Sequence, residues 1–335
     1  MLRHTTDYCD PMATNAGKPL DALDLIALGE PLVVMLPDRS GPLRAVPRFE
    51  RGIAGAECNV LLGMARLGGR GGLITRVGSD EFGHFVVETL RAVGIDTSRV
   101  EMDRRRPTGL YFREIAALNH SRPIYYRAGS AAAALSVDQI EVAYLVRARA
   151  FLTTGITALL SASAHDAVCA ALMAAHEHGL TTYFDPNLRN GLWGSARARQ
   201  LIRPLLRYVD VFLGGEDEAA LLTGRNGSPE KLATAVTRLG PREVVIKRGS
   251  AGAHGFDGDT SHSQAALPTV FKDAVGAGDG FNAGYITFRQ RGAALEEALR
   301  AGAICGASVC SSIGDFESFP RTDDLSVLMS DASAH

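Results

Sequence analysis

The sequence has no long apolar stretch and no excess of charge of either sign. Lys and Arg number 35 and Asp and Glu number 37, which leaves a formal charge of −2. This balance argues against nucleic acid or an anionic membrane as a partner, so any anionic ligand must be held by a few local groups. No apolar run approaches the roughly 20 residues that span a bilayer, and the first residues lack the apolar core of a secretory signal. We therefore expect a cytoplasmic protein.

Cysteine is scarce and its pattern is uninformative. The five cysteines are Cys9, Cys58, Cys169, Cys305 and Cys310. None forms a C-x-x-C pair and no histidine shows metal-ligand spacing, which predicts reduced thiols rather than disulfides or a zinc site. A dinucleotide-binding oxidoreductase is also disfavoured, because no G-x-G-x-x-G turn follows the first expected strand, where the sequence reads LGEPLVV.

What the sequence does contain is a regular alternation of β-rich runs and amphipathic helices. The runs end in Gly, Asp or another polar residue, and they predict strands at residues 24–30, 72–79, 150–155, 181–186, 210–215 and 243–249. Helical segments fall between them, as in residues 80–94, where apolar residues follow the i, i+3, i+4, i+7 spacing of one buried stripe. This alternation predicts an α/β fold in which helices cover both faces of a mostly parallel sheet.

We expect one main domain over residues 23–325, with flexible tails at 1–22 and 326–335. Two segments, about 31–53 and 105–128, carry Pro and Gly turns and aromatic strand formers instead of helices. We expect both to leave the main domain and form a small β-sheet. Such a sheet would serve as a lid over a site at the carboxyl ends of the parallel strands.

The most informative stretch is DAVGAGDGFNAGYI, residues 273–286. Backbone N–H groups at a helix start have no intrahelical partner, and glycines let the chain bend toward an anion there. A carboxylate at this place, Asp279, would repel a bound phosphate. It suits a base that takes a proton from a hydroxyl attacking phosphorus. The alternative is that Asp279 is only a favourable first-turn acid beside a tight turn.

This stretch resembles the D-T-x-G-A-G-D signature of the ribokinase-like (PfkB) carbohydrate kinases. Residues 54–83 resemble the N-terminal signature of the same family, with its marker residues in place: Gly55, Asn59, Gly68 and Gly78. Two long motifs in the family's order argue against a chance match. The resemblance runs from about Leu25 to Gly314, and it implies an ATP-dependent carbohydrate kinase with a ribokinase-like three-layer α/β/α fold and a small β-sheet lid.

By this resemblance Asp279 is the catalytic base, and the amides of Gly276, Ala277 and Gly278 hold the transferring phosphate. ATP and Mg²⁺ are the implied cofactors. Beside Gly276 and Gly278, the implied nucleotide contacts are Lys247, Gly249 and Gly252, although a surface β-turn would explain the same residues. Glu218 and Asp273 would reach the metal through water, or Asp273 would brace the turn. Three positions depart from the family pattern of Thr, Asn and Asn: Ala274, Gly215 and Gly302.

Three further stretches look like the 2-keto-3-deoxygluconate kinase subgroup: TGLYFRE at 108–114, YYRAGSAA at 125–132 and FDPNLRNGLW at 184–193. A sugar acid carries a carboxylate, which a guanidinium fork matches best. The implied acceptor-binding residues are Gly55, Glu57, Asn59, Tyr111, Arg113, Ile156, Arg189 and Asp279. Arg113 could instead be an exposed charge on its strand, and Arg127 a structural partner.

The leading hypothesis is ATP-dependent phosphorylation of 2-keto-3-deoxy-D-gluconate to its 6-phosphate. The same chemistry on a neutral ketose such as fructose or tagatose, or on a deoxy-ketogluconate of inositol breakdown, stays open. A non-catalytic sugar or nucleotide sensor is a further alternative. We also expect a homo-oligomer, because pairing two lids would bury an apolar face of the small sheet.

Overall fold

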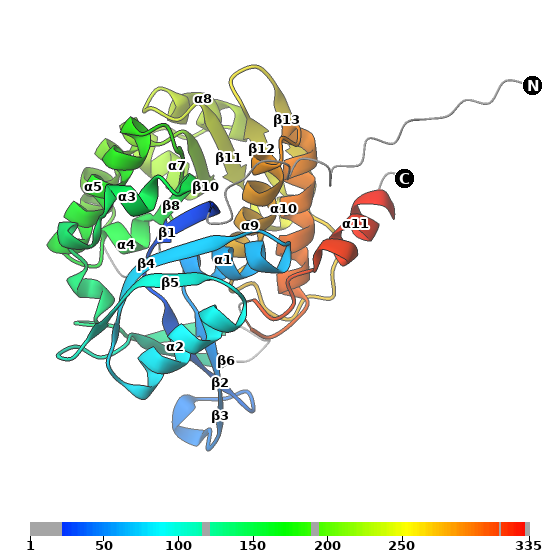
Figure 1. Cartoon of the computed structure of the whole chain (residues 1–335). Coiled ribbons are helices and arrows are strands. Elements are labelled where there is room, and N and C mark those ends of the chain that lie inside the picture. Colours follow the sequence, from blue (N-terminus) through cyan, green and yellow to red (C-terminus); the bar gives the residue numbers. More distant parts are fainter. Residues whose placement is uncertain (1–21, 116–120, 189–193, 315, 332–335) are drawn as a thin grey trace, which may run out of the picture.

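Nine strands form the main sheet in the computed structural model, which describes residues 22–115, 121–188, 194–314 and 316–331. Their order is β13-β12-β11-β10-β9-β8-β1-β4-β5 (Figure 1). Neighbours from β11 to β5 run parallel, whereas β12 and β13 are added antiparallel at one edge. The mostly parallel sheet is confirmed. The strand bounds are β1 (Leu23–Leu28), β4 (Gly71–Gly78), β5 (Asp96–Asp103), β8 (Ala148–Thr154), β9 (Thr181–Asp185), β10 (Val211–Gly215), β11 (Glu243–Lys247), β12 (Ala253–Phe256) and β13 (Ser261–Gln264).

Helices cover both faces of this sheet, because successive strand residues point to opposite sides. In β1, Leu25 packs in the core cluster shared with α1 (Ala56–Arg66), α2 (Glu81–Ala92), α9 (Ala277–Gln290) and α10 (Leu295–Cys310). Its neighbour Ile26 packs on the other side, against a layer formed by α3 (Val142–Leu145), α4 (Gly155–Ala158), α5 (Ala162–Glu177), α6 (Ser195–Ile202), α7 (Glu216–Thr223) and α8 (Pro229–Thr237). The expected three-layer α/β/α architecture is therefore confirmed.

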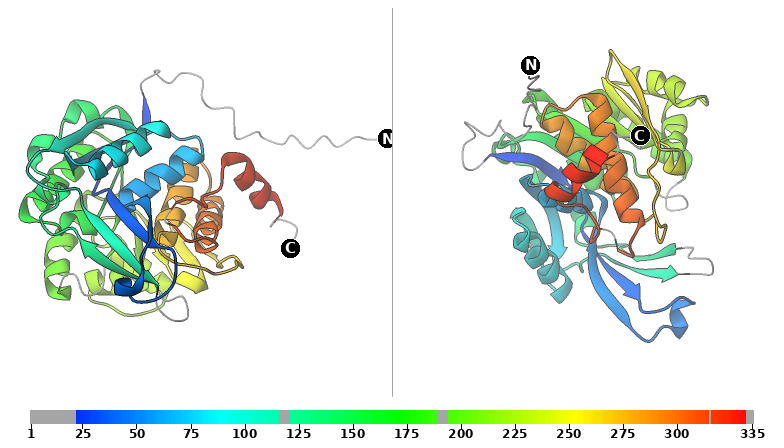
Figure 2. Two further views of the ribbon diagram at one scale, coloured as in Figure 1. Left: turned by 90° about the horizontal axis from the view of Figure 1, so that it is seen from below. Right: turned by 90° about the vertical axis from the view of Figure 1, so that its right-hand side faces the viewer.

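The small sheet is built from the two segments that break the alternation. Its order is β3-β2-β6-β7, and its strands are β2 (Leu32–Pro37), β3 (Phe49–Ala54), β6 (Leu110–Ile115) and β7 (Ser121–Tyr126). Because β2 follows directly on β1, this lid sheet projects from the end of the main body where the parallel strands end (Figures 1 and 2). The expectation of a small sheet attached at this edge is confirmed.

The two faces of the lid sheet differ. Leu32, Val34 and Tyr111 belong to one buried cluster on one face. On the other, Phe112 makes edge contacts with Phe49 and Tyr126, and Tyr126 is 62% exposed. The lid therefore buries the cluster of Leu32, Val34 and Tyr111 on one face, whereas the other face packs Val33 and Ile53 in the main core and also carries an aromatic strip.

The C-terminal boundary differs from the expected one. Helix α11 (Thr322–Asp331) crosses residue 325, and Leu325 packs with Leu67 and Ile304 in a small core cluster. Residues 326–331 thus continue a helix because its apolar side has a surface to pack on. The expected N-terminal tail falls almost wholly on residues outside the described range.

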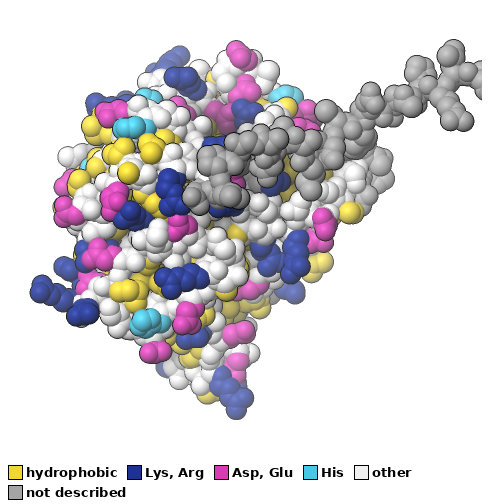
Figure 3. Space-filling model, viewed as in Figure 1, with side chains coloured by type: hydrophobic (Ala, Val, Ile, Leu, Met, Phe, Trp, Pro, Cys, Tyr) yellow, Lys and Arg dark blue, Asp and Glu magenta, His cyan; other side chains and the backbone are white. Residues whose placement is uncertain are grey.

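Short 3₁₀ helices complete the chain at Leu43–Ala45, Ala132–Ala134, Val137–Gln139, Arg203–Tyr208 and Gly249–Ala251. Among the helices of the described residues, none has the length and apolar character to cross a bilayer. Basic and acidic side chains are interspersed over the face shown in Figure 3.

Candidate active site

Asp279 lies in the first turn of α9 and is only 4% exposed. Asn59 of α1 donates from Nδ2 to its Oδ2 at 2.8 Å, and Asn187, just after β9, donates to its Oδ1 at 3.4 Å. Both partners are amide donors, which is the arrangement that an acceptor-only, ionised carboxylate requires. The predicted base and the predicted Asn59 therefore meet, although 220 positions separate them in the sequence.

The turn before α9 has the backbone shape that its glycines suggest. Gly276 is the N-cap residue with φ 84°, in the left-handed region that glycine adopts without steric cost. Gly278 is exposed, and the nearest atom to a Cβ added there would be Lys247 Nζ at 3.6 Å. The first turn of α9 is thus open to an approaching anion, with an ammonium group beside it.

Lys247, at the end of β11, is anchored below this turn. Its Nζ donates to Asp185 Oδ2 at 2.6 Å and to Asn282 Oδ1 at 3.4 Å. Asn282 Nδ2 in turn donates to Asp185 Oδ2 at 2.7 Å. Gly249 and Gly252 form the turn that follows β11, both with positive φ. This arrangement brings Lys247 and the turn of α9 together, as a phosphate site requires.

Glu218 caps its own helix. Its two carboxylate oxygens accept from the backbone N–H groups of Leu188 and Gly215, each at 2.6 Å. Burial, and next the negative charge of Asp185, raise the pKa of Glu218. Two acids therefore lie near each other where the family resemblance places the metal. Gly215 supplies only its backbone here, which is compatible with the loss of the family's Asn side chain.

Arg113 is fully buried, so the alternative of an exposed charge is wrong. Its NH1 lies 2.7 Å from Asp273 Oδ2, and its NH2 donates to the Tyr111 hydroxyl at 3.0 Å. Asp273 also accepts from the backbone N–H of Val275 at 3.1 Å. These contacts agree with the bracing role of Asp273, and its role at a metal through water stays a prediction. A strand of the lid is thereby joined to the turn of α9.

Glu57, in the first turn of α1, is buried beside α4. Its Oε1 accepts from the backbone N–H of Thr154 at 3.1 Å and from the hydroxyls of Thr154 and Thr157, each at 2.7 Å. Desolvation by burial raises its pKa, and the two threonine hydroxyls oppose that shift. The carboxylate thus holds the start of α4, where Ile156 is 7% exposed.

Gly55 stands where β3 returns from the lid. Its φ is 118°, and an added Cβ would lie 2.4 Å from the carbonyl oxygen of Glu30. Glu30, at the end of β1, is ion-paired with Arg127, which follows the last lid strand. This ion pair agrees with the alternative that Arg127 is a structural partner. Arg189 and Trp193 lie outside the described residues.

The match to known families follows this geometry. The model of the pfkB family carbohydrate kinases matches residues 24–322. The chain belongs to that family. This kinase is 37% identical over 317 residues to the 2-dehydro-3-deoxygluconokinase of Thermoproteus tenax, with 93% of this chain and 96% of that protein covered. It is 31% identical over 317 residues to the 5-dehydro-2-deoxygluconokinase of Lacticaseibacillus casei, with 93% and 97% covered.

Solved structures agree with the family assignment. A PfkB protein from Polaromonas sp. JS666 is 35% identical to this kinase, with a TM-score of 0.83 and coverage of 91% of this chain and 99% of that one. An E. coli protein in complex with ATP and Mg²⁺ is 26% identical, with a TM-score of 0.85 and coverage of 92% and 99%. The expected ATP-dependent sugar kinase and its ribokinase-like fold are thereby confirmed.

Three residues of the kinase site were not predicted individually: Asp185, Asn187 and Asn282. The first two stand in the DPN segment at the end of β9, and Asn282 is the first polar residue after the Asp279 turn. Polar residues directly after a buried strand are the signal that could have found Asp185 and Asn187. Asn282 carries no comparable signal, because a polar residue on a helix is usually exposed.

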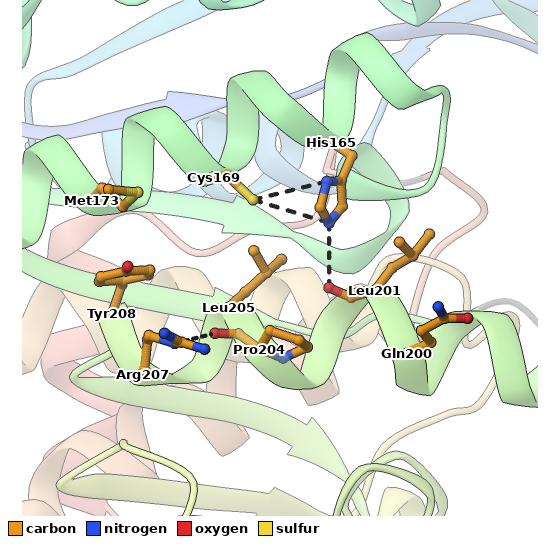
Figure 4. A pocket seen from close by; sticks show the side chains of 9 residues that line it. All are labelled: His165, Cys169, Met173, Gln200, Leu201, Pro204, Leu205, Arg207 and Tyr208. Carbon is orange, nitrogen blue, oxygen red and sulfur yellow. Dashed lines mark hydrogen bonds between the residues drawn. The ribbon is translucent and has the colours of Figure 1, made fainter.

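A surface pocket of about 220 Å³ lies elsewhere on the kinase, between α5 and the α6 region (Figure 4). Cys169 and His165 face each other across one helical turn, with Sγ 3.8 Å from Nδ1. Burial raises the pKa of the Cys169 thiol, which opposes thiolate formation. None of the predicted site residues lines this pocket. The candidate active site is therefore the polar cluster at the start of α9 and not this pocket.

Proposed function

We propose that this kinase transfers the terminal phosphoryl group of ATP to a sugar acid, 2-keto-3-deoxy-D-gluconate, and forms the 6-phosphate. The observation that carries the proposal is the pairing of Asp279, held by two amide side chains, with an open glycine turn beside Lys247. The Thermoproteus tenax relative is named 2-dehydro-3-deoxygluconokinase, and 2-dehydro-3-deoxygluconate is the systematic name of 2-keto-3-deoxygluconate. That name supports the choice of acceptor.

Asp279 would take the proton of the attacking hydroxyl. Its carboxylate is nearly buried and accepts hydrogen bonds from Asn59 and Asn187, which fix its orientation without neutralising it. A base positioned in this way typically contributes about 10²- to 10⁴-fold to a rate. Removal of the carboxylate should therefore abolish turnover while leaving nucleotide binding in place.

The turn Gly276 to Gly278 would receive the transferring phosphoryl group. Its backbone N–H groups stand at the positive end of the α9 dipole, and Lys247 adds a full charge beside them. When bound, ATP with Mg²⁺ supplies the phosphoryl group and neutralises part of its charge. Gly249 and Gly252, in the turn after β11, would lie along the nucleotide.

A single carboxylate such as that of Glu218 suits a metal ion whose other ligands are mostly water and phosphate oxygens. Within the ranges that the structure describes, no three His, Cys, Asp or Glu side chains are grouped as ligands for a metal ion. Mg²⁺ at nucleotide sites commonly keeps several waters and uses only one or two carboxylates. Glu218, with Asp185 near it, would therefore hold Mg²⁺ through water.

The acceptor would be bound by the lid. Arg113 and Tyr111 present a guanidinium and a phenol on the buried face of that sheet, and these groups suit a carboxylate and a neighbouring hydroxyl. Gly55, Glu57, Asn59 and Ile156 would line the opposite wall, and Arg189 would add a second guanidinium. Closing the lid would keep water from the phosphoryl group.

The test is ADP release with Mg-ATP across a panel of acceptors, with Asp279→Ala beside the wild type. The panel contains 2-keto-3-deoxygluconate, 5-keto-2-deoxygluconate, gluconate, fructose, tagatose, ribose and adenosine. Preference for the first compound, lost in Asp279→Ala, is the expected result. Preference for the second would follow the Lacticaseibacillus casei relative instead. Turnover with neutral sugars alone would remove the carboxylate role of Arg113, and no turnover with any acceptor would favour the sensor.

The oligomer and the cytoplasmic location stay predictions. A second copy of the chain could cover the aromatic strip of Phe49, Phe112 and Tyr126 on the outer face of the lid. Light scattering should then give a mass above that of one 35.6 kDa chain. A mass of one chain would exclude the oligomer.

A further inference from the structure

A buried ion pair joins the lid to the phosphate-binding turn. Arg113 of β6 and Asp273, three residues before the N-cap of α9, are 160 positions apart in sequence. Arg113 is 0% exposed and Asp273 is 6% exposed, so the pair is shielded from water. A buried pair of this kind is seldom needed for stability, because replacing both charges by apolar side chains is often neutral or favourable. A role in function therefore has to be considered.

Each partner is tied to a different functional part. Arg113 NH2 donates to the hydroxyl of Tyr111, so the guanidinium is held beside the other lid residue that is proposed to bind the acceptor. On the other side, Asp273 Oδ1 accepts from the backbone N–H of Val275, the residue before Gly276. The carboxylate thus holds the lid with one oxygen and the turn with the other.

We propose that Asp273 is a positioning residue that couples binding of the acceptor to binding of ATP. The proposal rests on the function proposed above, in which Arg113 binds the acceptor and the turn binds phosphate. An acceptor carboxylate that fixes the position of Arg113 also fixes the position of Asp273 and, through Asp273, the position of the turn. By thermodynamic reciprocity, ATP then favours acceptor binding by the same factor. On this proposal, weaker binding of ATP without the acceptor limits its hydrolysis by water.

The coupling is measured by calorimetry with a non-hydrolysable ATP analogue and Mg²⁺, with and without the acceptor that the panel identifies. In the wild type, each ligand should tighten the binding of the other by about 5- to 150-fold, the usual range of coupling between two sites. Asp273→Asn keeps the size of the side chain and an oxygen for Val275 but removes the charge that holds Arg113. We expect its coupling factor to fall to near 1. Asp273→Glu, which restores the charge, should recover part of it.

A matched control removes the charge of another buried carboxylate. Glu243 pairs with Arg289, which is also on α9, but at the far end of that helix from the turn. Glu243→Gln should lower stability and leave the coupling factor unchanged. In steady state, the KM for ATP should fall with rising acceptor concentration in the wild type and in Glu243→Gln, and stay constant in Asp273→Asn.

The outcomes separate the two proposals. If no acceptor in the panel is phosphorylated, the proposed function fails. If an acceptor is phosphorylated and a folded Asp273→Asn keeps the wild-type coupling factor, the function stands and the coupling role of Asp273 is refuted. If Asp273→Asn does not fold, Arg113→Lys removes the guanidinium that pairs with Asp273 and so breaks the same ion pair from the lid side. An unchanged factor in that variant also refutes the inference.

Discussion

The contact between α1 and α9 leads to the sharpest prediction. Gly63 lies one helical turn after Asn59, and Ala283 lies one turn after Asp279. A Cβ added to Gly63 would stand 2.6 Å from the Cβ of Ala283, and 3.0 Å from a ring carbon of Phe319. Residues 63 and 283 thus contact each other one helical turn away from the hydrogen bond between Asn59 and Asp279.

The Gly63→Ala substitution should therefore disturb both stability and catalysis. Ordinary carbon–carbon contacts are about 3.5–4.0 Å, so the two helices must separate by about 1 Å where residues 63 and 283 meet. Overpacking of this kind costs about 1–3 kcal/mol of unfolding free energy, of which the better helix propensity of alanine offsets up to about 1 kcal/mol. The same displacement one turn away would weaken the 2.8 Å bond from Asn59 to Asp279. A misplacement of about 1 Å can lower a rate by on the order of 10²-fold.

The assay is urea unfolding together with kcat for ADP release, and a second substitution provides the internal check. Ala283→Gly removes the opposing methyl group, at a cost of about 1 kcal/mol in helix propensity. The double variant should recover part of both losses, and the remaining deficit reflects Phe319. Gly194→Ser, at the N-cap of α6, where nothing lies within 4 Å of the added Cβ and where serine is a favoured residue, is the control and should stay within about 0.5 kcal/mol of the wild type. Full activity in Gly63→Ala, or no recovery in the double variant, would refute the argument.

Three further predictions concern single groups of the site. Burial holds the pKa of Glu57 above its ordinary value of 4.5, so the stability linked to this carboxyl is complete below that value and is lost as pH rises. The Tm of Glu57→Gln relative to the wild type should thus increase from pH 5 to pH 8, and a difference that does not change with pH would contradict this reading. Gly276→Ala should cost about 1–2 kcal/mol, because φ is 84° there. Gly278→Ala, in the regular helix, should keep the Tm yet raise the KM for ATP, because the methyl group would stand in the open approach to the turn; an unchanged KM would place the phosphate elsewhere.

The regular strands could be predicted because their signal is local. The runs that became β1, β4, β8, β9, β10 and β11 are apolar on both faces and end in polar residues, as buried parallel strands do. The edge strands β5 and β13, and β12 beside β13, were not predicted. Residues such as Asp96, Glu101 and His262 make the two edge strands polar, because one side of an edge strand meets solvent. Their pairing is set by the neighbouring strand and not by their own composition.

The site was predictable only where its residues share a motif. The segment 273–279 carries the turn and the base together, so their proximity follows from the chain itself. Arg113 could be proposed as a ligand from its residue type, but its burial and its partner Asp273 depend on how the lid docks on α9. Asp185 and Lys247 meet for a similar reason, since β9 and β11 flank β10 in the sheet. No local pattern encodes these pairings.

These long-range contacts converge on one place, the start of α9. Asn59 reaches it from α1 across 220 positions, and Arg113 reaches it from the lid across 160. The proposed base and phosphate turn thus depend on the docking of α1, the lid and the strand ends against that helix. Catalytic competence is thus a property of the docked α9 and not of its motif alone, which is why a methyl group at Gly63, far along α1, is expected to act on the chemistry.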